Sequence, residues 1–181
     1  MIRLIVLIGL PGSGKSSLAR SLLSDCPNRQ LVSTDAIRAQ LFGDEAVQGS
    51  WLQVWREVER QLRHQVAAIQ RGDTFDVIYD ATNVRRRSRR EAIVLGREVG
   101  FNCIAGVWVD TPLDLCLQRN RSRDRQVPED VILRMSCQLH DAPPGDDEGF
   151  HLLVRYTGAA AEYGNRDRPV EQQPNSPPPA T

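Results

Sequence analysis

The chain has 181 residues, 40% of them hydrophobic, so it can bury one core of ordinary size but is short for two. Its 23 basic and 23 acidic side chains balance, and no apolar stretch approaches the roughly 20 residues of a membrane span. Residues 1–10 lack the basic flank and cleavage site of a secretory signal. We therefore expect a cytoplasmic protein with no membrane partner.

The first predicted element is a buried parallel strand at residues 2–8, and a glycine-rich loop and a helix over residues 17–23 follow it. The loop has the P-loop spacing G-x-x-x-x-G-K-S, and its Lys15 is the only lysine in the chain. Backbone N–H groups of such a loop surround phosphate oxygens. The residues predicted to bind ATP are Gly9, Pro11, Gly12, Ser13, Gly14, Lys15, Ser16 and Ser17. Ser16 is also predicted to hold Mg²⁺.

A second strand at residues 30–33 precedes a short helix at residues 35–41. Asp35 then lies at the carboxyl end of the sheet, on the same edge as the P-loop, where α/β folds bind ligands. A carboxylate there can take the proton of an acceptor hydroxyl, and Arg38, one turn later, can bind an anionic group of the acceptor. The alternative is that Asp35 only caps the helix and that Arg38 is solvated.

A long amphipathic helix is predicted at residues 51–69, with one wide apolar stripe. Trp51 and Trp55 begin this stripe. They can stack on a nucleobase or pack in the core, and their phase within the stripe favours core packing.

Polar residues follow the third predicted strand, at residues 75–80. Asp80 is placed to contact Mg²⁺ through water or to help position the acceptor, and Thr82 and Asn83 are hydrogen-bonding partners for the acceptor. A plain turn before the next helix is the alternative interpretation.

The rest of the chain continues the alternation of helices and strands. Helices are predicted at 89–99, 111–120 and 128–140, and strands at 103–109 and 150–156. We therefore expect an α/β protein with the three-layer P-loop NTPase fold and a five-stranded, mostly parallel sheet. Residues 1–163 form the predicted kinase domain, and the proline-rich residues 164–181 are a predicted disordered tail.

Two runs of arginine stand out. The first, at residues 85–90, either meets phosphates of an acceptor or forms a solvated helix face. The second lies between two predicted helices, where P-loop kinases carry a lid that supplies positive charge to the transferring phosphate. Its members are Arg119, Arg121, Arg123 and Arg125.

The chain resembles the kinase half of the phage polynucleotide 5′-kinase/3′-phosphatase, and more broadly the P-loop kinases that include zeta toxins. The resemblance rests on the P-loop, on Asp35-x-x-Arg38, on the segment from Asp80 to Asn83 and on the second arginine run. It implies that Lys15, Asp35 and Arg123 are catalytic, with Asp35 as the general base, and that Arg38 binds the phosphate next to the reacting nucleotide. The lid is about one residue shorter here, so Arg121 or Arg125 can take the place of Arg123.

From these features we expect an ATP- and Mg²⁺-dependent kinase whose acceptor is a nucleic-acid 5′-hydroxyl. A small-molecule alcohol, such as a sugar, an antibiotic or a nucleotide sugar, is the second candidate acceptor. A regulatory module that binds ATP and hydrolyses it slowly is a third possibility. The nucleobase preference and the oligomeric state do not follow from the sequence.

Overall fold

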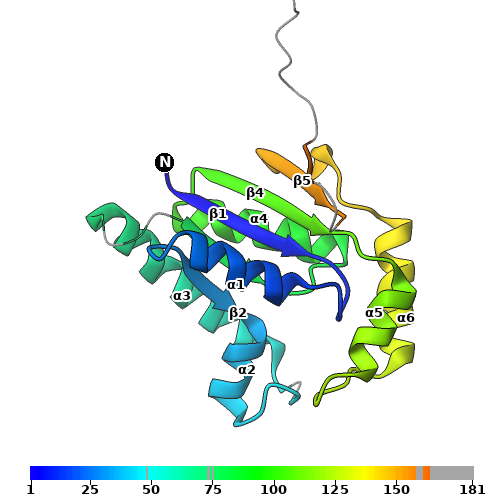
Figure 1. The fold of residues 1–181 in the computed structure, drawn as a ribbon. Coiled ribbons are helices and arrows are strands. Elements are labelled where there is room, and N and C mark those ends of the chain that lie inside the picture. Colours follow the sequence, from blue (N-terminus) through cyan, green and yellow to red (C-terminus); the bar gives the residue numbers. More distant parts are fainter. Residues whose placement is uncertain (48, 73, 75, 158–160, 164–181) are drawn as a thin grey trace, which may run out of the picture.

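Strand β1 (Arg3–Ile8) lies at the centre of a six-stranded sheet in the computed structural model (Figure 1). The structure describes residues 1–157 and 161–163, except 48, 73 and 75. The strand order is β2-β3-β1-β4-β5-β6. The first five strands pair in parallel, and only β6 runs antiparallel to its neighbour β5. The predicted five-stranded parallel sheet is confirmed, and the short β6 extends it.

The elements alternate along the chain as the hydrophobic pattern predicts. The other strands are β2 (Gln30–Ser33), β3 (Asp76–Asp80), β4 (Cys103–Val109), β5 (Leu152–Tyr156) and β6 (Ala161–Tyr163). The helices are α1 (Lys15–Asp25), α2 (Thr34–Phe42), α3 (Trp51–Arg71), α4 (Arg86–Val99), α5 (Leu113–Arg121) and α6 (Glu129–Asp141), with a short 3₁₀ helix η1 (Asp146–Glu148).

Helices cover both faces of the sheet, which confirms the three-layer fold. On one face, Ala19 of α1 packs with Ile5, Leu7 and Ile78 from β1 and β3. On the other face, α3 and α4 cover the larger cluster of buried residues. Figure 1 shows α1 in front of the sheet and α3 and α4 behind it. Strands covered on both faces have continuous apolar runs, and for this reason β1 is apolar from Leu4 to Ile8.

The carboxyl ends of the parallel strands meet at one edge of the sheet. The P-loop follows β1 at this edge, α2 follows β2, and a polar turn follows β3. Figure 1 shows α5 and α6 beyond the same edge, with α2 on the opposite side of the space between them. This edge therefore collects the predicted site residues.

Two expectations differ from the structure or fall outside it. Trp51 is not a core residue, because 49% of its surface is exposed and the buried cluster extends along α3 only as far as Trp55. The predicted disordered tail, residues 164–181, lies outside the described residues. Within the described part of the chain, no helix has the length and apolar character needed to cross a membrane.

Candidate active site

The loop between β1 and α1 has the backbone shape that a phosphate cradle requires. Gly12 and Gly14 have φ angles of +81° and +99°, in the left-handed region that favours glycine. A β-carbon on Gly12 would also stand 2.4 Å from the carbonyl oxygen of Cys116 in α5. Thr111, just before α5, donates from its hydroxyl to the carbonyl of Ser13 at 2.8 Å. The loop is thus packed against the segment that leads into the predicted lid.

Lys15 is folded into this loop. Its ammonium group donates to the carbonyl oxygens of Gly9 at 2.9 Å and Leu10 at 2.7 Å. Burial lowers the pKa of Lys15 to about 8, although the negative charge of Asp80 acts in the opposite direction. An anion in the loop would replace the two carbonyls as partner of the ammonium group and would favour its charged form.

The hydroxyl of Ser16 donates to a carboxylate oxygen of Asp80, at the end of β3, over 3.1 Å. Burial raises the pKa of Asp80, whereas the charge of Lys15 and the Ser16 hydrogen bond lower it. A hydroxyl oxygen and a carboxylate oxygen side by side are hard donors of the kind that Mg²⁺ prefers. The two residues therefore fit the role of holding a magnesium ion beside the phosphates.

The turn after β3 is fastened to the P-loop side of the sheet. The carbonyl of Thr82 accepts a hydrogen bond from the N–H of Gly9 at 2.9 Å. Asn83 has a left-handed φ of +48°, and its buried amide donates to the carbonyl of Leu7 at 2.8 Å. Asn83 thus uses its amide to join β3 to β1, and the predicted contact of Thr82 and Asn83 with an acceptor stays a prediction.

Asp35 lies in the first turn of α2, but it does not cap that helix. The cap is Ser33, whose hydroxyl accepts from the N–H of Ala36 at 3.4 Å. The Asp35 side chain is 52% exposed and accepts a hydrogen bond from Arg38 at 3.0 Å. The capping alternative therefore does not apply, and the carboxylate is open to solvent at the edge that carries the P-loop.

Arg38 is mostly buried and only partly paired. Its Nη1 contacts Asp35, whereas its Nε is buried without a hydrogen-bond partner among the described residues. The guanidinium also lies over the ring of Trp51, with Cζ 5.9 Å from the ring centroid. A buried donor without a partner costs free energy, so Arg38 has a hydrogen-bonding capacity that the described residues do not use.

The arginines of the predicted lid differ in the residues that they contact. Arg125 reaches across to α2 and the loop after it, where it pairs with Asp35 at 3.5 Å and Glu45 at 2.9 Å. Arg121 pairs with Glu129 at 2.6 Å and so belongs to the lid's own surface. A guanidinium nitrogen of Arg119 lies 3.8 Å from where a β-carbon on Gly14 would stand.

The electrostatics of Lys15 indicate which predicted residues share one site. Besides Asp80, the charges of Arg123 and Asp35 both act on its pKa, Arg123 lowering it and Asp35 raising it. Asp35 and Arg123 therefore lie near enough to Lys15 for their charges to act on its ammonium group. This arrangement can hold a polyphosphate and present a carboxylate to a second substrate.

Sequence reasoning missed one residue next to the site. Arg89 of the first arginine run is fully buried, which neither interpretation of that run included. It forms two hydrogen bonds of 2.6 Å with Glu148 and donates to the carbonyls of Val84 and Ala142 at 2.8 Å. It thereby ties the turn after β3 to the end of α6. The position of Arg89 in an arginine run gave no signal for this role.

Comparison with known proteins agrees with this geometry. Residues 4–141 match the family described as an AAA domain. The L-seryl-tRNA(Sec) kinase of Methanococcus maripaludis is 27% identical over 136 residues, which are 73% of this chain and 50% of that protein. The chain thus spans about half the length of this curated relative.

Solved structures show the same fold. Two structures of a Pnkp1/Rnl/Hen1 complex, one described as an RNA repair complex, contain chains with TM-scores of 0.62 and 0.53 and identities of 24% and 28%. The first match covers 77% of this chain and 44% of the matched chain, and the second covers 69% and 40%. A sugar kinase from Janibacter sp. HTCC2649 has a TM-score of 0.56 at 17% identity, with 86% of each chain covered. The fold is that of a kinase-type P-loop domain.

Proposed function

The chain belongs to the AAA-domain family of P-loop proteins, and from this premise we propose that it transfers the γ-phosphate of ATP to the 5′-hydroxyl of a nucleic acid. The observation that carries the proposal is the pairing of an exposed carboxylate, Asp35, with the incompletely paired Arg38, at the same mouth as Lys15. A P-loop alone specifies a phosphate ligand and no reaction. The carboxylate and the arginine supply what an acceptor hydroxyl with a neighbouring phosphate requires.

In the proposed reaction, the oxygen of the acceptor hydroxyl forms a bond to the γ-phosphorus, and Asp35 accepts the proton of that hydroxyl. The bond between that phosphorus and the β–γ bridging oxygen breaks, and ADP leaves. Lys15 neutralises charge on the outer phosphates, and Arg123 is proposed to supply positive charge from the lid. Ser16, with the help of Asp80, would hold Mg²⁺, which would supply further positive charge to the bound phosphates.

The nature of the relatives supports a nucleic-acid acceptor. The names of the L-seryl-tRNA(Sec) kinase and of the Pnkp1 complex both refer to RNA. Because the chain spans only about half of these proteins, the acceptor is proposed on the geometry of Asp35 and Arg38 together with these names.

The test is transfer of labelled γ-phosphate to a nucleoside and to its 3′-monophosphate, which differ only in the group proposed to meet Arg38. A charge-assisted bidentate contact contributes roughly 1.5–3 kcal/mol, so kcat/KM should be about ten- to a hundredfold higher for the 3′-monophosphate. Arg38→Ala should remove this preference while ATP binding persists. Equal rates for the two acceptors in the parent protein would contradict the proposal.

A small-molecule alcohol is the second candidate, favoured by the sugar kinase that matches this chain over 86% of both lengths. It predicts the opposite result. A sugar or another neutral alcohol would then be phosphorylated faster than any 5′-hydroxyl nucleotide, and the 3′-phosphate would bring no advantage. The same labelled-ATP assay on a panel of sugars, nucleosides and oligonucleotides separates the two candidates.

A further inference from the structure

Trp51, the first residue of α3, is exposed over 49% of its surface although it belongs to an apolar stripe. Large aromatic side chains are usually buried, and exposed ones often mark binding surfaces. The Trp51 ring contacts two other side chains. Arg38 lies over it at 5.9 Å, and the Trp55 ring has its centroid 5.8 Å away at an interplanar angle of 31°. The indole is thus held in place while much of its surface stays open.

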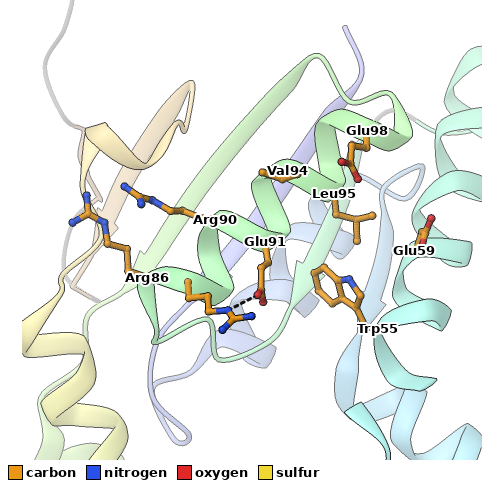
Figure 2. Close-up of a pocket in the computed structure, with 9 residues that line it drawn as sticks. Trp55, Glu59, Arg86, Arg90, Glu91, Val94, Leu95 and Glu98 are labelled. Atoms are coloured by element: carbon orange, nitrogen blue, oxygen red, sulfur yellow. Dashed lines mark hydrogen bonds and ion pairs between the residues drawn. The ribbon is translucent and has the colours of Figure 1, made fainter. Parts of the chain in front are cut away.

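Trp55 in turn forms one wall of an open groove of about 540 Å³ between α3 and α4 (Figure 2). Glu91 and Leu95 of α4 face Trp55 in this view, whereas Arg86 and Arg90 point to the other side of α4. The volume is within the range of about 300–1,000 Å³ that ligand sites have.

A continuous series of contacts joins this groove to the proposed general base. Asp35 contacts Arg38 at 3.0 Å, and Arg38 lies over Trp51, which is beside Trp55. Trp55 then lines the groove together with Arg87. A ligand that begins at Asp35 and Arg38 therefore reaches Trp51 next, whose surface is 49% exposed.

The charged side chains of the groove leave little positive charge open beside Trp55. Arg86 pairs with Asp147 and Arg87 pairs with Glu91, and Figure 2 shows Arg90 on the other side of α4. Glu59 and Glu98 add negative charge farther along the groove. The groove thus offers a strand the aromatic surface of Trp55 and no open cation there.

Alternating aromatic rings and arginines are the means by which proteins bind single-stranded nucleic acid, since bases stack on the rings and phosphates pair with the guanidiniums. We propose that the acceptor strand leaves the catalytic cleft over Trp51 and Trp55, so that its first bases stack on the two indole rings. This inference rests on the proposed function and adds a binding track for single-stranded nucleic acid. The acidic end of the groove limits the track to the first two or three nucleotides.

Binding of 3′-fluorescein-labelled, 5′-hydroxyl oligoadenylates of one to six nucleotides, measured by fluorescence anisotropy, tests the track without requiring catalysis. Affinity should rise up to the third nucleotide and then level off. Trp51→Ala should raise Kd for the trinucleotide about tenfold, and Trp51→Phe should restore most of the affinity, because stacking needs only an aromatic face. Leu52→Ala, which removes an exposed apolar neighbour, is the matched control and should leave Kd unchanged.

Arg90→Ala is a second control. The Arg90 side chain lies on the other side of α4 from Trp55, so this variant should leave Kd unchanged. Melting temperatures of all variants, measured in parallel, show whether each one is folded.

The outcomes separate this inference from the proposed function. Oligonucleotide binding that depends on Trp51, without phosphate transfer, would keep the track and remove the 5′-kinase proposal. Transfer with unchanged affinity in Trp51→Ala would remove the track and keep the kinase. Absence of oligonucleotide binding in the parent protein would overturn the track outright.

Discussion

Lys15 stands out at the scale of single residues, because the chain's only lysine is buried with a pKa of about 8. Burial disfavours the charged form of the side chain, so about half of the Lys15 side chains are uncharged amines at pH 8. Phosphates in the loop act in the opposite direction, because they favour the ammonium ion and raise its pKa. Binding of the polyphosphate should therefore be coupled to uptake of a proton.

We predict that ATP binding at pH 8 takes up about half a proton, and that uptake falls towards zero at pH 6, where Lys15 is already protonated without ligand. Isothermal titration calorimetry in buffers of different ionisation enthalpy measures this quantity. Lys15→Arg is the control, since a guanidinium stays protonated throughout. Uptake that persists unchanged in this variant would assign the proton to another group.

Asp35 is the second residue whose role can be measured on its own. Asp35→Asn keeps the shape of the side chain and its place beside Arg38 but removes the proton acceptor. We expect kcat to fall by about 10²- to 10⁴-fold, the range typical of a general base, with little change in ATP affinity. Steady-state kinetics on the true acceptor measures the first effect and calorimetry the second. Parental turnover in Asp35→Asn would show that another group takes the proton.

At the scale of elements, the arginines of the end of α5 and of the segment between α5 and α6 differ in their partners. Arg121, the last residue of α5, pairs with Glu129 at the start of α6. In the segment itself, Arg125 pairs with Asp35 and Glu45, and the charge of Arg123 acts on Lys15. The segment thus connects to α2 through Arg125 and to the P-loop lysine through the charge of Arg123. Such a bridge is what a closing lid needs, because it can sense both substrates.

The lid arginines should accordingly differ in their effect on turnover. Arg123→Ala should lower kcat by 10²-fold or more, on the order of what one removed charge-stabilising donor costs. Arg121→Ala is the matched control, since its exposed pair with Glu129 is a surface salt bridge that contributes little. Single-turnover rates at saturating ATP measure the transfer step. Equal small losses in both variants would indicate a diffuse basic surface instead of a lid.

At the scale of the whole molecule, the sequence predicts best what is specified locally. The strand β1, the P-loop and the bounds of β2 and β4 follow from apolar runs and glycine spacing over a few residues. The predicted start of α4 was three residues late, because its first turn is made of arginines that local propensity does not favour at a helix N-terminus. The phase of α3 predicts a buried Trp51, but the residues of α3 that belong to the core begin only one turn after it.

What the sequence could not show are contacts between distant segments. Glu148 follows Arg89 by 59 residues, and no local pattern connects them. The same holds for Arg125, whose partners Asp35 and Glu45 lie in another element. The residue types of the candidate site could thus be predicted from motifs, whereas the partners that orient them come from the assembled fold.

The Arg89–Glu148 pair provides the test at this scale, because its partners join the turn after β3, the end of α6 and η1. Both side chains are essentially fully buried. Removing one partner leaves a buried charge without compensation, so Arg89→Met should lower the free energy of unfolding by about 3–5 kcal/mol. Replacing both, as Arg89→Met with Glu148→Leu, should recover part of this loss, since an apolar pair leaves no charge unpaired. Urea denaturation of the two single variants and the double variant gives the coupling energy. A double variant whose loss equals the sum of the single losses would show that the two side chains stabilise the fold independently.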